Sequence, residues 1–512
     1  MSSSAPLTTR TEAHRRLGVP AVAFMIVAAS APLTVIAGGS TSAFSVTHVL
    51  GVPFGFVVLA AALAVFAIGY AAMSRFVTNA GAFYSYVSQG ISRPAGIGAA
   101  VLALIAYNAM QVGIWGMFGF QMSSFIESKT GVAISWWIWV LAGIAVVAVM
   151  GVNRVDLSAK VLGVLVALEF VVVIVFDVVA FANPAEQLTA APISPAALFV
   201  PGVGAVLAFG IAAFMGFESA AIYGEESKDP KRTIPRATFL AVAVIGIFYT
   251  ISSWALALAV GPEKIMDPSG ITAAEAGPPL FFDFVFARLG AIWVDIMSVL
   301  FITSVFAAVV SFHNAVARYA FSLGREGVLP GGLASIRRES GAPWAGSLLQ
   351  TAIAVVVVLG FAVGEIGWDP AAGPFPVLTL FTWLTNLGAF GLVLLMALVS
   401  VAVIGFFRRD ARDVGVGSRV VAPFVSLFAL GTVWVLILAN WDVLLGQAET
   451  TPTSFILPAA ILVPSAAAVL WGFWLRRARP EVYARIGHGA EQIGAPVLGD
   501  EPVGTGAADT AP

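Results

Sequence analysis

The chain has 512 residues, of which 59% are hydrophobic and only 11% are charged. Soluble globular proteins carry about 25% charged residues, so this composition excludes a soluble domain and predicts an integral membrane protein. The chain contains no cysteine, which excludes disulfides, thiol catalysis and thiolate metal sites.

Apolar runs long enough to cross the ~30 Å hydrocarbon core of a bilayer, about 17 to 25 residues, recur along the whole chain. Because helices satisfy their own backbone hydrogen bonds in lipid, these apolar runs indicate an all-α protein. They predict twelve transmembrane helices, at 20–46, 52–74, 94–122, 133–152, 158–182, 198–224, 235–260, 287–322, 344–365, 375–404, 416–438 and 454–476.

An even number of spans places both termini on the same side of the membrane. With the N-terminus in the cytoplasm, all lysines and arginines except Lys129, Lys264 and Arg288 fall in cytoplasmic segments. Cytoplasmic loops are enriched in these residues. The bias therefore predicts a multi-pass protein of the plasma (inner) membrane with both termini cytoplasmic.

The first span carries Pro32 at its middle, flanked by Ser30 and Thr34. A helix breaker inside a membrane is tolerated where the freed backbone groups face protein, water or a ligand. We therefore expect helix 1 to be broken at mid-membrane, with polar groups gathered at the break.

The third span has three strongly polar residues in its inner half, Tyr107, Asn108 and Gln111. Asn108 and Gln111 are three residues apart and share a helix face. Buried amides require partners. The pair either binds a substrate side chain or ties helix 3 to its neighbours, and the sequence leaves both alternatives open.

The fifth span contains two acids. Glu169 lies nine residues after Lys160, about 13 Å along a helix, and so near mid-membrane. Asp177 lies near the outer end of the same span, where we expect a solvated side chain.

The sixth span ends in small residues between Gly210 and Gly216, followed by Glu218. Glu218 precedes the charged cluster that begins at Glu225 by seven residues, which places it ~10 Å below the cytoplasmic surface. An acid inside the membrane faces a cavity, pairs, or takes up a proton. Glu218 is thus a candidate for proton coupling, or alternatively it braces a break in helix 6.

Spans 1 and 6 are five apart, the spacing expected of two inverted five-helix repeats whose first helices are broken. The tenth span places Thr382, Thr385 and Asn386 on one face, with Trp383 beside them.

No phosphate-binding loop and no metal-ligand spacing occur in the sequence. We therefore expect no enzymatic activity, cofactor, metal or nucleic-acid partner. The tail 480–512 is rich in small and polar residues and is expected to be cytoplasmic and disordered.

Four motifs resemble the amino acid, polyamine and organocation transporter superfamily. They are "NAGAFYSYVSQGISRPAG" from Asn79, "GFESAAIYGEESKDPKRTIPRAT" from Gly216, "NAVARYAFSLGREGVLP" from Asn314 and "GAPWAGSLLQ" from Gly341. The resemblance runs in order from about residue 17 to residue 409.

This resemblance implies a leucine-transporter-like fold that works by alternating access. It implies a cytoplasmic tail at 1–18, a first five-helix repeat at 19–182, a second, inverted repeat at 198–409, and two further helices within 416–476. In the superfamily, the substrate's carboxylate and amine are held by backbone groups freed at the breaks in helices 1 and 6.

Carried over by position, the resemblance implies a substrate site built from helices 1, 3, 6, 8 and 10. Ala212 and Ala213 occupy the place where some relatives carry a large aromatic, which implies a roomier pocket or a gate supplied by another helix. The implied site residues are Ser30, Ala31, Pro32, Leu33, Thr34, Tyr107, Asn108, Gln111, Phe209, Gly210, Ala212, Ala213, Phe214, Gly216, Phe312 and Trp383.

No lysine, arginine or aspartate falls in this site, so the expected substrate is a neutral amino acid. If Glu218 faces the site and stays ionised, a basic amino acid or a polyamine becomes the better interpretation. An amino acid or amine exchanger and a non-transporting amino acid sensor are the remaining alternatives, and the oligomeric state is left open.

Glu169 occupies the position where some relatives carry a lysine in place of a bound sodium ion, so it is a second candidate for proton coupling. Sodium-coupled relatives also use helix 8 hydroxyls. The stretch Val305 to Val310 has none, although Thr303, Ser304 and Ser311 flank it. Proton coupling is therefore favoured over sodium.

Overall fold

The computed structural model describes residues 18–77, 82–153, 159–217, 229–337, 341–447 and 449–487. Within these ranges the regular secondary structure is helical and contains no β-strand. Eleven helical stretches there are long and apolar enough to cross a membrane, and one shorter apolar helix stands at the place of the sixth predicted span. The prediction of an all-helical, multi-pass membrane protein is confirmed.

The apolar helices follow the predicted spans closely, and α7 and α15 run several residues beyond them. The first span is made of α2 (Val19–Ala29), α3 (Pro32–Thr34), the π-helix η1 (Val35–Ser40) and α4 (Thr41–Thr47). The others are α5 (Val52–Ser74), α7 (Arg93–Thr130), α8 (Trp136–Asn153), α9 (Ala159–Ala182), α11 (Val203–Ala212), α12 (Pro230–Val260), α15 (Ala291–Glu326), α16 (Trp344–Gly364), η7 (Val377–Phe381) with α17 (Thr382–Arg409), η8 (Gly417–Val421) with α18 (Ala422–Ala439), and α20 (Pro452–Ala478).

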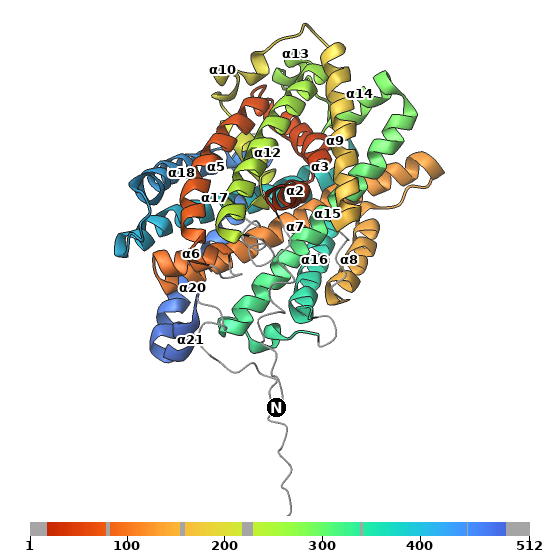
Figure 1. Ribbon diagram of the computed structural model, residues 1–512. Helices are drawn as coiled ribbons and strands as arrows, with labels where there is room; N and C mark the ends of the chain where they lie inside the picture. Colours follow the sequence, from red (N-terminus) through yellow and green to blue (C-terminus); the bar gives the residue numbers. More distant parts are fainter. Residues whose placement is uncertain are drawn as a thin grey trace, which may run out of the picture.

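Short helices connect these spans at the two ends of the bundle. Figure 1 shows α10 (Pro195–Leu198), α13 (Pro262–Met266) and α14 (Pro279–Leu289) at one end, and α6 (Ala82–Gly90) and α21 (Pro480–Arg485) at the other. A further short helix, α19 (Trp441–Leu444), follows α18.

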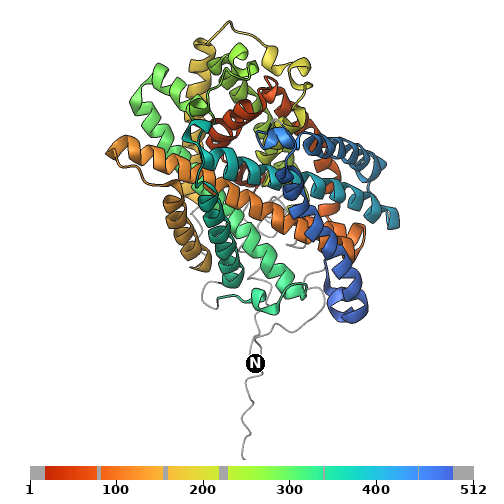
Figure 2. The same ribbon diagram turned by 180° about the vertical axis from the view of Figure 1, so that it is seen from behind.

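The long helix α7 lies at the centre of the bundle and packs against α15, α17 and α20. Both views of the molecule show it crossing the interior (Figures 1 and 2). The apolar parts of α7 and α17 are 78% buried, whereas those of α8 and α20 are only 28% and 22% buried. The central helices therefore form the interior of the bundle, and the peripheral helices present their apolar faces to lipid.

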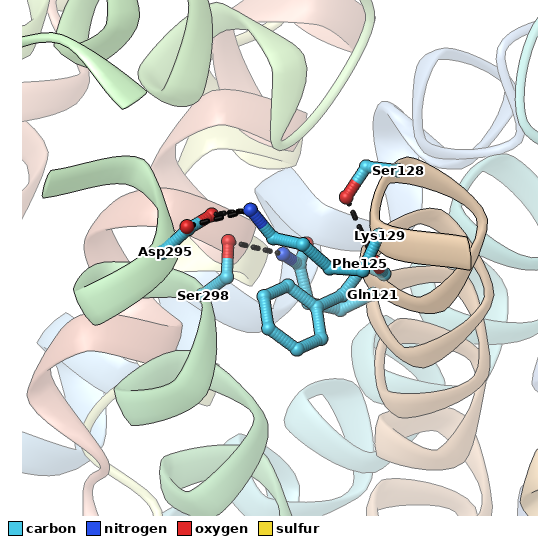
Figure 3. Close-up of polar contacts among 6 residues, drawn as sticks. All are labelled: Gln121, Phe125, Ser128, Lys129, Asp295 and Ser298. Carbon is cyan, nitrogen blue, oxygen red and sulfur yellow. Dashed lines mark hydrogen bonds and ion pairs between the residues drawn. The ribbon is translucent and has the colours of Figure 1, made fainter. Parts of the chain in front are cut away.

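Three helices are joined by polar contacts across their interfaces. Lys129 Nζ donates to Asp295 Oδ2 at 2.6 Å and Gln121 Nε2 donates to Ser298 Oγ at 3.2 Å, which joins α7 to α15 (Figure 3). Deeper in the bundle, Gln350 Nε2 of α16 donates to Gln111 Oε1 of α7 at 2.8 Å. We call α7, α15 and α16 the tied helices below.

The chain after α20 differs from the sequence interpretation, which began a disordered tail at 480. Residues 480–485 form α21, and Ile486 is 1% exposed in a small apolar cluster with Ile97 and Leu475. The backbone N–H of Gly487 donates to Glu326 Oε2 at 3.3 Å. The apolar residues between the charged ones give this segment something to bury, and residues 488–512 lie outside the described ranges.

Candidate substrate site

The first span is interrupted between α2 and α3. Pro32 disfavours a helical conformation at the residue before it, and Ala31 is not helical but adopts a left-handed backbone with φ 52° and ψ 74°. This conformation costs an L-residue roughly 1–2 kcal/mol. Ser30 Oγ lies 2.6 Å from Tyr249 Oη on α12 and also donates to the carbonyl oxygen of Val27, so contacts on both sides of Ser30 hold the interruption in place.

The helix continues past the interruption with a π-helical turn, η1. Such turns occur often at functional sites because they displace side chains from the regular register. Within η1, a Cβ on Gly38 would lie 3.0 Å from Met117 Cε, whereas a Cβ on Gly39 would meet nothing within 4 Å. Gly38 therefore serves helix packing, and Gly39 faces open space.

The sixth apolar segment is short. Helix α11 ends at Ala212, and the chain turns through residues 213–217, with Gly216 at φ 103°. Only glycine adopts this backbone readily. The proton-coupling candidate Glu218 lies outside the described residues.

A cavity of about 60 Å³ lies where the interruption of the first span meets the end of α11. Its polar side chains are Ser30, Thr34, Ser40 and Thr385, and no acidic, basic or histidine residue lines it among the residues described. The complete lining comprises Ser30, Ala31, Thr34, Val35, Gly39, Ser40, Ala43, Val52, Phe56, Met110, Ile114, Phe209, Gly210, Ala212, Ala213, Met215, Ala308, Phe312, Phe381 and Thr385.

Half of the predicted site residues line this cavity. They come from the interruption of the first span, from the C-terminal part of α11 and from α15, namely Ser30, Ala31, Thr34, Phe209, Gly210, Ala212, Ala213 and Phe312. The others, Pro32, Leu33, Tyr107, Asn108, Gln111, Phe214, Gly216 and Trp383, do not line it.

The helix 3 residues contact neighbouring helices. Gln111 accepts the hydrogen bond from Gln350, so of the two alternatives it takes the role of a tie. Tyr107 packs its ring 6.2 Å from that of Phe312 and therefore lies one layer behind the cavity wall. Asn108 is half-buried, and its Oδ1 accepts no hydrogen bond within the described structure.

On helix 10, the structure brings Thr385 and Phe381 to the cavity instead of Trp383. The indole of Trp383 packs 6.1 Å from the ring of Phe361 on α16. Residues two apart on a helix point about 200° apart, so Trp383 and Thr385 cannot both face the cavity.

Because Ala212 and Ala213 carry small side chains, the aromatic residues of the cavity wall stand at other positions, partly on other helices. Phe56 of α5 lines the cavity together with Phe209, Phe312 and Phe381. The ring of Phe56 also lies 5.4 Å from the ring of Tyr249. Phe56 had no sequence signal, because it is one of many phenylalanines in apolar spans.

Beside the cavity, Glu169 of α9 forms a polar junction with α3 and α15. Its side chain is 2% exposed. Glu169 Oε2 accepts hydrogen bonds from Ser304 Oγ at 2.7 Å and from the backbone N–H of Leu33 at 3.3 Å. Thr34 Oγ1 donates to Ser304 Oγ at 3.0 Å. We call these four residues the Glu169 junction.

The junction exists because the first span is interrupted. The N–H groups at the start of a helix have no partner within that helix, and Leu33 is the second residue of α3. A carboxylate at a helix N-terminus also interacts favourably with the helix dipole. Since Thr34 both lines the cavity and belongs to the junction, one residue links the two sites.

Two details differ from the sequence interpretation. The helix 8 hydroxyl sought within 305–310 is present at Ser304, directly before that stretch. Asp177 is not solvated: it is 6% exposed and accepts a hydrogen bond from Ser252 Oγ at 2.7 Å. In both cases the neighbouring helix, which the sequence alone does not place, decides the environment.

Several known transport proteins are similar in sequence to this chain. The low-affinity putrescine importer PlaP of Escherichia coli (strain K12) is 23% identical over 441 residues, covering 84% of this chain and 90% of that protein. The lysine-specific permease LysP of Lactococcus lactis is 27% identical over 324 residues, covering 59% of each protein. The branched-chain amino acid permease BcaP of the same organism is 22% identical over 404 residues, covering 74% of this chain and 80% of that protein.

The family profile described as "Amino acid permease" matches residues 17–468. This range contains the interruption of the first span, the end of α11, the cavity and the Glu169 junction. The chain therefore belongs to the amino acid permease family, within the amino acid–polyamine–organocation superfamily.

Proposed function

We propose that this permease takes up neutral amino acids by alternating access and couples their movement to protons through Glu169. The observation that carries the proposal is the position of Thr34, which lines the cavity and donates to Ser304 in the Glu169 junction. Substrate in the cavity and a proton on Glu169 thereby act on the same short segment of the first span.

The proposed architecture is two inverted repeats, 19–182 and 198–409, followed by two helices within 416–476. The interruption at Ala31 and the early end of α11 support this arrangement, because they lie in the first helix of each repeat. In such transporters, substrate and ion sites lie at mid-membrane between broken helices. The sidedness proposed from the basic residues places both termini in the cytoplasm of a plasma membrane protein.

The substrate class follows from the cavity lining. Its side chains are mostly apolar, and we expect the carboxylate and the amine that all amino acids share to bind beside the helix ends near Ala31 and Ala212. A second positive charge in an apolar cavity would lose its hydration without a counter-ion. PlaP and LysP are named for putrescine and lysine, so transport of a cation by this chain would need an acid such as Glu218 at the site.

The coupling step follows from the hydrogen bonds of Glu169. As a carboxylate, it accepts from the backbone of Leu33 and from Ser304, and thereby holds the start of α3 against α9 and α15. Protonation removes the charge and weakens both bonds, since hydrogen bonds to charged groups contribute about 1.5–3 kcal/mol and neutral ones about half of that. The first span is then freer to move relative to the tied helices.

Sodium coupling is the second candidate. The carboxylate of Glu169 and the hydroxyls of Ser304 and Thr34 bring three oxygen-bearing side chains together, and oxygen ligands suit hard cations. The absence of a helix 8 hydroxyl within 305–310 had favoured protons over sodium, and Ser304 supplies such a hydroxyl.

Uptake into liposomes that hold the purified protein tests the proposal. A panel of radiolabelled neutral amino acids, basic amino acids and polyamines is offered with an inward proton gradient, with an inward sodium gradient, or with neither. Accumulation of a neutral amino acid under the proton gradient alone is the expected result. Accumulation under sodium alone, entry only into preloaded liposomes, or binding without flux would identify a sodium symporter, an exchanger or a sensor respectively.

A further inference from the structure

The chain that follows α20 turns back and packs against the bundle, at the end where α6 also lies (Figure 1). It consists of α21 and two further residues, and we call residues 480–487 the docked segment. Ile486 is 1% exposed and clusters with Ile97 of α7. The side chain of Val482 contacts the residue directly after α15, because a Cβ on Gly327 would lie 3.4 Å from Val482 Cγ1. The docked segment therefore touches α7 and the end of α15.

Gly487 is held by both of its backbone groups between α6 and α15. Its N–H donates to Glu326 Oε2 of α15 at 3.3 Å, and its carbonyl oxygen accepts from Gln89 Nε2 of α6 at 3.0 Å. Gly487 has φ 79°, a conformation that favours glycine. A Cβ at this position would lie 2.5 Å from Ser88 Cβ. Both the backbone conformation and the available space therefore require glycine here.

Glu326 joins α6 and α15 beneath the docked segment. Its side chain is 3% exposed, and its Oε1 accepts a hydrogen bond from Tyr84 Oη of α6 at 2.7 Å. A buried carboxylate is costly unless hydrogen bonds compensate its lost hydration. Because the N–H of Gly487 donates to the second oxygen, the docked segment stabilises the contact between α6 and α15.

A row of aromatic rings leads from this contact to the cavity. The ring of Tyr84 lies 6.2 Å from that of Tyr319, which lies 5.6 Å from that of Tyr107. Tyr107 lies 6.2 Å from Phe312, and Phe312 lines the cavity. Since protein interiors contain few voids, packed side chains transmit displacements to their neighbours. A separation of α6 from α15 should therefore also displace the cavity wall.

The contact joins parts of the bundle that carry different walls of the cavity. Helix α6 is the next helix in the chain after α5, which contributes Val52 and Phe56 to the lining. Helix α15 is one of the tied helices. Alternating access moves one group of helices against another around the substrate site. A segment that fastens α6 to α15 should therefore resist such a movement.

We propose that the docked segment is a regulatory strap, which holds this end of the bundle closed and must leave Glu326 each time the end opens. The inference rests on the alternating-access transport proposed above. Docking stabilises the closed end through the buried side chain of Ile486 and the hydrogen bond of Gly487 to Glu326. Release of the strap should therefore make transport faster.

The first test measures docking and does not depend on transport. The chain has no cysteine, so Ile486→Cys introduces a single reactive thiol into the full-length protein. We expect it to react with a water-soluble maleimide at least ~10-fold more slowly than Ala484→Cys, because a buried thiol reacts only when its segment opens. Ala484 is exposed on α21 and serves as the control. Equal rates at the two positions would overturn the docking.

The second test measures the effect of release on exchange into preloaded liposomes. Gly487→Val should release the strap and raise the initial rate ~10-fold, as the loss of a hydrogen bond to a charged group implies, with little change in the apparent KM. Ile486→Cys labelled after folding should do the same, because the adduct cannot return to its buried site. Labelled Ala484→Cys should transport at the wild-type rate.

The labelled protein keeps the test decisive if Gly487→Val fails to fold. An unchanged or lower rate in labelled Ile486→Cys, while wild type transports, would overturn the strap. An equal increase in labelled Ala484→Cys would also overturn it, because the label would then act without undocking. Absence of transport by wild type would instead contradict the proposed function.

Discussion

The two acids of α9 are both buried, but they have different hydrogen-bond partners and contact different helices. Glu169 is 2% exposed and Asp177 is 6% exposed, and eight residues separate them. Glu169 contacts α3 and α15 through two hydrogen bonds to one oxygen. Asp177 accepts a hydrogen bond from Ser252 of α12 and lies in the wall of an open groove between α9 and α12.

This difference teaches that burial does not assign a role to an intramembrane acid. The partners of Glu169 include a backbone N–H that exists as a free donor only because the first span is interrupted. Any change in the charge of Glu169 therefore acts on a segment that also lines the cavity. Within the described residues, the side-chain hydrogen bond of Asp177 joins α9 to α12 and not to the first span.

The largest expected effect separates the two acids directly. Glu169→Gln keeps the size and the hydrogen-bond acceptor of Glu169 but cannot carry a proton. We expect gradient-driven accumulation to fall at least ~10-fold, the effect of losing about 1.4 kcal/mol of coupling, with exchange into preloaded liposomes retained. Initial rates of uptake measure both activities.

Asp177→Asn is the matched control for this prediction. It should change accumulation by less than ~2-fold, because neither Asp177 nor its hydrogen-bond partner Ser252 lines the cavity. Equal losses in the two variants would contradict the separation of roles, and equal retention would remove Glu169 from coupling.

A change in the cavity wall should alter which amino acids the protein prefers as substrates. Ala212→Phe places a large ring in the cavity wall, so the apparent KM of the largest transported amino acid should rise about 10-fold, as filling occupied space costs roughly 1–3 kcal/mol. The KM of the smallest substrate should change much less. Uptake kinetics for both substrates measure this difference, and equal changes would show that the cavity does not hold the side chain.

Weakening the junction should give a smaller, graded effect. Ser304→Ala removes one hydrogen bond from Glu169 and the acceptor of Thr34. That bond favours the charged form of the carboxylate, so the variant should take up its proton more readily. The proton concentration at which uptake is half-saturated should therefore fall by a few-fold. The dependence of uptake on external pH measures the change, and Ser311→Ala on the same helix is the control. A rise in the half-saturating proton concentration would contradict the assignment of Ser304 as a hydrogen-bond donor to Glu169.

The smallest effect is expected for the exposed ion pair shown in Figure 3. Lys129 and Asp295 keep 42% and 39% of their side-chain surface exposed, and such pairs contribute about 0.2–1 kcal/mol. Lys129→Met should lower the midpoint of thermal unfolding slightly, and the difference should shrink in high salt. A large, salt-independent loss of stability would show that the pair is more than a surface contact.

Hydropathy was enough to predict the helical membrane class and most span boundaries, since burial in lipid imposes its own length on a helix. Pro32 likewise pointed to the interruption of the first span, because the restriction that proline places on Ala31 is local. These features depend on residues close in sequence.

The features that depend on neighbouring helices were harder to predict. Trp383 was assigned to the site although helical geometry turns it toward Phe361, and Phe56 and Phe381 were missed because a phenylalanine in an apolar span gives no signal. The environment of Asp177 depends on α12, and the docking of α21 depends on Glu326 and Ile97. In each case the deciding contact joins residues far apart in the chain.

The most direct test of the account measures substrate and proton movement together. Liposomes that hold wild type, Glu169→Gln or Asp177→Asn are loaded with a pH-sensitive dye and given a transported neutral amino acid without sodium. The account predicts substrate-dependent acidification with wild type and with Asp177→Asn, and none with Glu169→Gln. Acidification that persists in Glu169→Gln, or uptake by wild type without any proton movement, would contradict the claim that Glu169 carries the coupled proton.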